Sequence, residues 1–129
     1  MPDQDNDRAE VDRFLLERIE TVPHLEALLL LWNSRPKTWS ADAIADALYI
    51  PAEAARMILD DLARENLAAV SGSPAGYFYE SEPARDRLAG LVDLAYRREL
   101  VRITRLIHSK PSAAIREFAR AFRLRKEHE

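Results

Sequence analysis

Apolar residues recur at helical spacing along the first part of the chain. From Val11 to Ile19 they occupy positions i, i+3, i+4 and i+8, which predicts an amphipathic helix. Pro23 interrupts this pattern, and because proline fits the first turn of a helix but not its interior, a second helix is expected over residues 24–33. That second segment is apolar on nearly every side, which indicates a central, buried helix.

Two shorter helices are predicted next, separated by a tight turn. Ser40 is a favourable N-cap for a helix over residues 41–48. Pro51 suits the first position of the following helix, which extends to residue 65. Asn66 can adopt the left-handed conformation that ends such a helix.

A β-hairpin is predicted after these helices. Residues 67–71 and 77–79 favour strands, and the turn between them contains two glycines and a proline. Pro83 then begins a long helical pattern that runs to about residue 109, and a last amphipathic helix follows the break at Pro111.

One apolar stripe in the long helix suggests self-association. Its residues recur at intervals of four, three and four positions: Tyr96, Leu100, Ile103 and Ile107. We interpret the stripe as a dimer interface, and packing under the last helix is the alternative. The chain is thus expected to divide into a disordered acidic tail (1–10), a domain of helices and one hairpin (11–82) and C-terminal helices for dimerisation (83–129).

The order of these elements carries a family resemblance. The residues that carry it run from Trp39-Ser40 through Leu48-Tyr49-Ile50-Pro51 to Leu62, Asn66-Leu67 and Gly76-Tyr77. This segment, about residues 24–82, resembles the winged helix-turn-helix domain of transcriptional regulators, including the MarR-like group. The resemblance implies a mainly α fold with a two-stranded wing, a recognition helix over residues 51–65, and a C-terminal dimerisation extension.

Charge divides unevenly along the 129 residues. Residues 1–82 hold 16 acidic and 7 basic side chains, whereas residues 83–129 hold 6 acidic and 12 basic ones. Such asymmetry indicates either a basic contact surface or two halves that attract each other. The net charge of −3 gives no independent indication of nucleic-acid binding.

The expected recognition helix is itself acidic. At 100° per residue its outward face carries Glu53, Met57, Asp60 and Arg64, with Arg56 on the flank. Asp60 and Arg64 are spaced to pair with each other. Base-reading faces usually offer basic or amide side chains, so this face departs from the family pattern.

The residues that we expect to contact DNA come from three regions. They are Arg35, Lys37, Glu53, Arg56, Arg64, Arg116, Arg120 and Arg123. The last three stack at i, i+4 and i+7 and could hold a phosphate backbone, although an ordinary surface helix with extended arginines is the alternative.

Catalytic and metal-binding motifs are not found in the sequence. It has no cysteine, three widely separated histidines and three glycines, so we expect no thiolate site, metal centre, phosphate loop or cofactor. Residues 28–32 form the longest uncharged apolar run, far below the roughly 20 residues that a membrane span needs. A cytoplasmic location without membrane contact is the default expectation.

These observations favour a homodimeric regulator that binds double-stranded DNA without catalysis. The alternative is a winged helix that docks a basic protein partner and does not bind DNA. The sequence identifies neither an operator nor a small-molecule effector.

Overall fold

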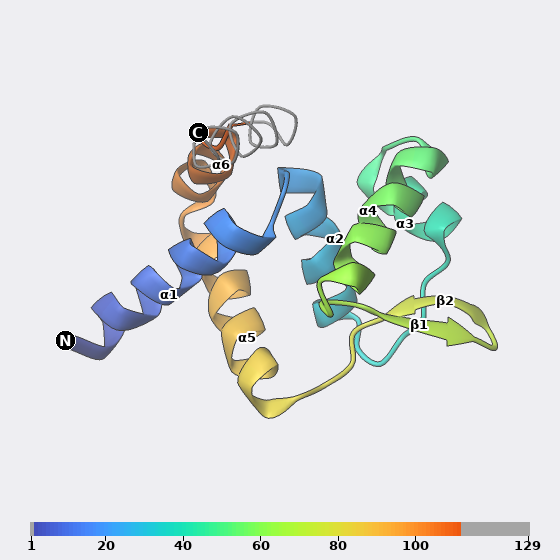
Figure 1. Cartoon of the computed structure of the whole chain (residues 1–129), viewed down its shortest axis with the longest axis horizontal. Helices are drawn as coiled ribbons and strands as arrows, with labels where there is room; N and C mark the ends of the chain where they lie inside the picture. The colour runs from blue at the N-terminus through green and yellow to red at the C-terminus, as the bar shows by residue number, and fades with distance from the viewer. Residues whose placement is uncertain (1, 112–129) are drawn as a thin grey trace, which may run out of the picture.

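The computed structural model describes residues 2–111; Met1 and residues 112–129 lie outside the described part of the chain. This part is mainly helical, with one two-stranded antiparallel sheet. The elements follow in the order α1 (Pro2–Arg18), α2 (Val22–Asn33), α3 (Ala41–Leu48), α4 (Ala52–Arg64), β1 (Ala69–Gly72), β2 (Ala75–Phe78), α5 (Pro83–Arg98) and α6 (Leu100–His108). Figure 1 shows α2 in the middle, with α1, α5 and α6 on one side and α3, α4 and the hairpin on the other.

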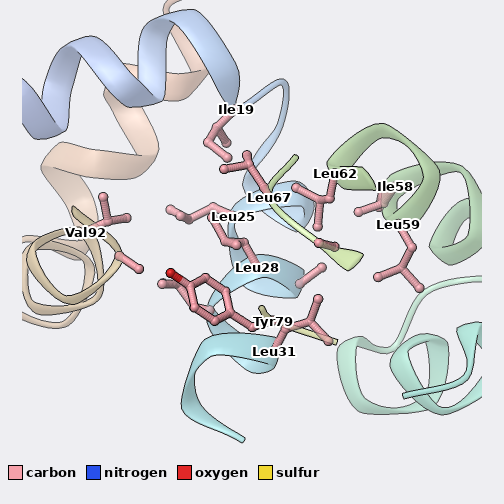
Figure 2. Packing of buried hydrophobic residues seen from close by; sticks show 14 of the residues in the cluster. Ile19, Leu25, Leu28, Leu31, Ile58, Leu59, Leu62, Leu67, Tyr79 and Val92 are labelled. Atoms are coloured by element: carbon pink, nitrogen blue, oxygen red, sulfur yellow. The ribbon is translucent and has the colours of Figure 1, made fainter. Parts of the chain in front are cut away.

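Helix α2 is the central buried helix that its apolar sequence predicts. The Thr21 side chain accepts a hydrogen bond from the His24 backbone N–H and so caps the helix, while Pro23 lies in the first turn. Leu25, Leu28 and Leu31 are at most 2% exposed. In Figure 2 they lie between Val92 of α5 and the leucine-rich side of α4. Both sides of the molecule therefore share one core.

The predicted helix-turn-helix corresponds to α3 and α4. The Ser40 hydroxyl accepts a hydrogen bond from the Ala43 N–H at 3.1 Å, as expected of an N-cap. Tyr49 joins the two helices in the left-handed region, with φ of 57°. Asn66, with φ of 59°, follows the end of α4, which confirms the conformation expected of it.

The hairpin is tied to the segment before α3. Val70 pairs with Tyr77 across the two strands. Trp39 forms a bridge to Tyr77, in which each backbone N–H donates to the other residue's carbonyl oxygen at 2.7 and 2.8 Å. A Cβ at Gly76 would collide with the Trp39 carbonyl, so glycine permits this close approach. The arrangement is compatible with a winged helix.

The expected disordered tail is wrong for the residues that the structure describes. Helix α1 begins at Pro2 and continues through Val11. Its acidic side chains have basic partners on α5: Arg87 donates to Asp7 Oδ1 at 2.6 Å and to Glu10 Oε1 at 2.8 Å. Asp7 and Glu10 therefore lie on a face of α1 that is turned towards Arg87.

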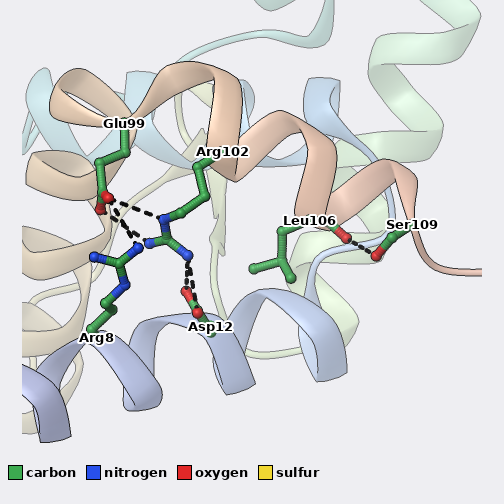
Figure 3. A network of polar contacts seen from close by, with 6 residues as sticks. All are labelled: Arg8, Asp12, Glu99, Arg102, Leu106 and Ser109. Carbon is green, nitrogen blue, oxygen red and sulfur yellow. Dashed lines mark hydrogen bonds and ion pairs between the residues drawn. The ribbon is translucent and has the colours of Figure 1, made fainter.

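The expected single long helix after Pro83 is also wrong. Helix α5 ends at Arg98 and α6 begins at Leu100, with Glu99 at φ −131° and ψ 48° between them. Figure 3 shows the polar network at this break, in which Arg102 binds both Glu99 and Asp12 of α1. The hydrogen bond from Arg102 lowers the pKa of the Glu99 carboxyl. This network holds α6 against α1.

The break changes the role of the apolar stripe. Ile103 and Ile107 are 0% and 3% exposed, so they belong to the chain's own core rather than to a dimer interface. They belong to the hydrophobic cluster of the described residues, in which α6 contacts α1. The alternative, packing under a last helix, lies outside the described residues. Tyr96 is partly buried, and Leu100 is half-exposed. Only Tyr96 and Leu100, the first two residues of the stripe, therefore remain accessible to a partner.

Candidate nucleic-acid interface

Helix α4 presents one polar face to solvent and buries the other. Its buried residues are Ala55, Ile58, Leu59 and Leu62. Its outward residues agree with the helical projection, and they line a shallow hollow of about 290 Å³: Glu53, Arg56, Met57, Asp60, Asp61 and Arg64. The hairpin borders this face through Tyr77, whose hydroxyl donates to Asp60 Oδ1 at 2.6 Å. A macromolecule on α4 would therefore also meet the hairpin.

Hydrogen bonds already engage half of this polar face. The bond to Asp60 raises the pKa of Tyr77 and keeps its hydroxyl protonated. Asp61 accepts from His24 Nε2 at 2.8 Å through one carboxylate oxygen and binds Arg64 through the other. The spacing suggested an Asp60–Arg64 pair, but Arg64 binds Asp61 instead. Arg64 is thus exposed yet committed to an intrachain ion pair.

The buried His24 side chain makes a contact with Asp61 that the sequence did not indicate. Its imidazole lies at the start of α2, where Nδ1 is 2.6 Å from the Thr21 hydroxyl oxygen. Burial lowers the pKa of His24, so the neutral ring donates through Nε2 to Asp61 and accepts from Thr21 at Nδ1. Asp61 is 37 positions further along the chain, so no local pattern could have indicated the pair.

Three exposed cations lie within the helix-turn-helix or in the segment that precedes it in the chain. Arg35 lies over the Trp32 ring at 3.4 Å, and Lys37 lies over the Trp39 ring at 3.9 Å. Both are exposed, as is Arg56 on α4. Within residues 2–111, no ion pair joins any of these three side chains to a carboxylate. They are available for phosphate groups, and the tryptophan rings hold two of them close to the surface.

Apolar side chains also reach solvent near the same face. Met57 on α4 is 60% exposed and Val70 on β1 is 67% exposed. Val70 and Tyr77 are paired residues, so they lie on the same face of the hairpin. The turn of the hairpin, residues 71–76, contains no lysine or arginine. The surface is therefore mixed, with acidic, basic and apolar groups side by side.

The remaining predicted site residues lie elsewhere. Arg116, Arg120 and Arg123 fall outside the residues that the structure describes. Tyr96 and Leu100 lie on α5 and α6, on the other side of α2 from α4. The structure therefore brings Glu53, Arg56 and Arg64 together and leaves the expected dimer residues at a distance.

A separate cavity lies between α1, α5 and the connection from α4 to β1. Its volume is about 440 Å³, and its lining is mixed, with apolar contributions from Phe14, Leu67 and Tyr79. Arg85 also lines it and donates to the Asn66 carbonyl oxygen at 2.8 Å, while its buried Nε has no hydrogen-bond partner among the described residues. Burial and the hydrogen bond to Asp86 raise the pKa of Tyr79.

Among the described residues, no group of three or more histidine and carboxylate side chains could hold a metal ion. In the same part of the chain, no helix has the length and apolar character needed to cross a membrane. Comparison with protein-family models, with curated proteins and with solved structures found no match for this chain.

Proposed function

We propose that this protein binds double-stranded DNA as a non-catalytic, homodimeric transcriptional regulator. One observation carries the proposal: the exposed face of α4 lies beside the hairpin and carries Arg56, and this arginine, like Arg35 and Lys37 in the segment before α3, has no ion-pair partner within residues 2–111. In a winged helix-turn-helix, α4 would enter the major groove and the hairpin would approach the backbone.

The charges on α4 determine how such binding would work. Glu53 and Asp60 repel phosphates, so the affinity must come mainly from those three cations. Arg35 and Lys37 follow the end of α2, outside α4, where they can contact a backbone that the helix itself does not touch. Arg116, Arg120 and Arg123 would add phosphate contacts from the C-terminal segment.

A second copy would bind through the surface near the junction of α5 and α6. Leu94, Leu100 and Val101 are 43%, 50% and 60% exposed there, although large apolar side chains are usually buried. Dimerisation would cover these exposed apolar side chains. Two copies would double the number of phosphate contacts and present two α4 helices to one duplex.

Titration of the full-length protein into labelled duplexes tests DNA binding. Arg56→Ala should weaken binding and lower the slope of log K against log salt by about one. Arg13→Ala is the matched control, because Arg13 is an exposed arginine on α1, away from the proposed interface. Equal effects of the two substitutions, or no binding by the wild-type protein at low salt, would refute the proposed interface.

The second candidate function is a docking module for a basic protein. Its supporting observation is the exposure of Met57 between the carboxylates of Glu53 and Asp60, a combination suited to a basic segment with an apolar anchor. Glu53→Lys distinguishes the two candidates: it should strengthen DNA binding but abolish capture of a basic partner.

A further inference from the structure

Some outward side chains of α4 form no hydrogen bond or ion pair within the described chain. These side chains indicate which bases the helix would read. This inference rests on the proposed DNA-binding function. Asp60 is held by Tyr77, and Asp61 is held by His24 and Arg64. The outward residues without such contacts are Glu53, Arg56 and Met57, all in the first half of the helix.

Position along α4 favours these three residues. The N-terminal part of a recognition helix is the part that contacts base edges. Glu53 and Arg56 are spaced for an i, i+3 ion pair, and Arg56 and Asp60 for an i, i+4 pair, but neither pair forms among the described ion pairs. Each of the two side chains therefore remains available to a base.

The chemistry of each side chain specifies a base. A glutamate carboxylate accepts from the amino group of cytosine, and a guanidinium donates to both acceptors of guanine in the major groove. An apolar side chain contacts the methyl group of thymine. Residues three apart rise by about 4.5 Å along a helix, close to the roughly 3.4 Å between base pairs, so Glu53 and Arg56 can reach neighbouring pairs.

We propose that α4 selects a short site in which Glu53 reads a cytosine, Arg56 reads a guanine in the adjacent base pair, and Met57 lies against a thymine methyl group. The acidic residue that weakens attraction to phosphates would then contribute specificity. Asp60 and Arg64, which intrachain contacts already hold, would not select bases.

Selection of bound duplexes from a randomised pool, using the full-length protein, tests this proposal. The selected site should contain a cytosine that Glu53→Gln replaces by adenine, because glutamine pairs with adenine. Exchange of that cytosine should weaken wild-type binding by about tenfold and leave the Glu53→Gln variant little affected. Deoxyuridine in place of thymine should weaken the wild type but not Met57→Ala.

Asp60→Asn is the matched control, since it removes the same negative charge from the same helix. It should raise overall affinity, as Glu53→Gln does, without changing the selected sequence. If both variants select the wild-type site, or if no cytosine is enriched, the base assignment is wrong while DNA binding stands. If no duplex is bound at low salt, the proposed function fails and the assignment fails with it.

Discussion

His24 at the start of α2 and Asp61 in α4 are joined by a hydrogen bond of 2.8 Å between the imidazole Nε2 and a carboxylate oxygen. The bond connects the central helix directly to the helix that carries the proposed interface. Because Thr21 binds the other ring nitrogen and Arg64 binds the other carboxylate oxygen, the buried imidazole links three further side chains into one network. This contact therefore adds to the buried apolar face of α4 in fixing the helix against the core.

Stability should fall as the pH is lowered towards 5, partly because of His24. Burial lowers the pKa of His24 below 6.5, so below that pH the unfolded chain binds a proton that the folded protein resists. The free energy of unfolding should therefore fall as pH drops through 6.5 and level off below the folded-state pKa. Urea unfolding of the wild type and of His24→Gln at pH 8 and pH 5 measures this contribution. An equal pH dependence in both proteins would contradict it.

Removal of Asp61 should destabilise the protein more than removal of Asp60. Asp61→Ala leaves the buried His24 ring without its acceptor, at a cost of about 1–3 kcal/mol. Asp60→Ala breaks only an exposed hydrogen bond to Tyr77, so its cost should stay below about 1 kcal/mol. Chemical denaturation of the two variants compares them. A larger loss for Asp60→Ala would show that the His24 contact contributes little.

Tyr49 should be replaceable by glycine with a gain in stability. Its φ of 57° is unfavourable for a residue with a Cβ, and its side chain is 94% exposed, so little packing is lost. We expect Tyr49→Gly to raise the free energy of unfolding by up to about 1 kcal/mol. Ala47→Gly, at an exposed helical position in α3, should lower it by about 0.5–1 kcal/mol. Thermal melts that show the same sign for both would contradict this explanation.

Two substitutions in α6 should have different effects, one on folding and the other on self-association. Ile103→Ala creates a cavity in the core and should cost about 2–5 kcal/mol. Val101→Glu places a charge on an exposed position, so it should leave the fold intact and weaken the dimer. Circular dichroism reports folding and light scattering reports oligomeric state. A folded, monomeric Ile103→Ala variant, or a Val101→Glu variant that dimerises like the wild type, would contradict this division.

The features that the sequence predicted are local ones. The Ser40 cap, the left-handed Asn66 and the outward face of α4 depend on residues within about one helical turn of each other. The features that it missed depend on distant partners. Asp7 and Glu10 are ordered opposite Arg87, about 80 positions away in the chain.

The same distinction applies to the candidate site. Periodicity identified the outward residues of α4, but it could not show which of them were already bound. Asp60 is engaged by Tyr77 from the hairpin, and Asp61 by His24 from α2. The apolar stripe correctly indicated a helix face that is partly buried, but it did not show what buries it. After the break at Glu99, Ile103 lies in the core of the chain itself.

Salt-dependent DNA titration tests the central claim most directly. One variant combines Arg56→Ala in α4 with Arg35→Ala and Lys37→Ala in the segment before α3. Its control combines Arg13→Ala, Arg98→Ala and Arg105→Ala, which remove the same charge from exposed positions on α1, α5 and α6. We predict that the first variant loses about three units of slope in log K against log salt per protomer, while the control keeps the wild-type slope. Equal slopes for all three proteins, or no duplex binding by the wild type, would contradict the claim that this face binds DNA.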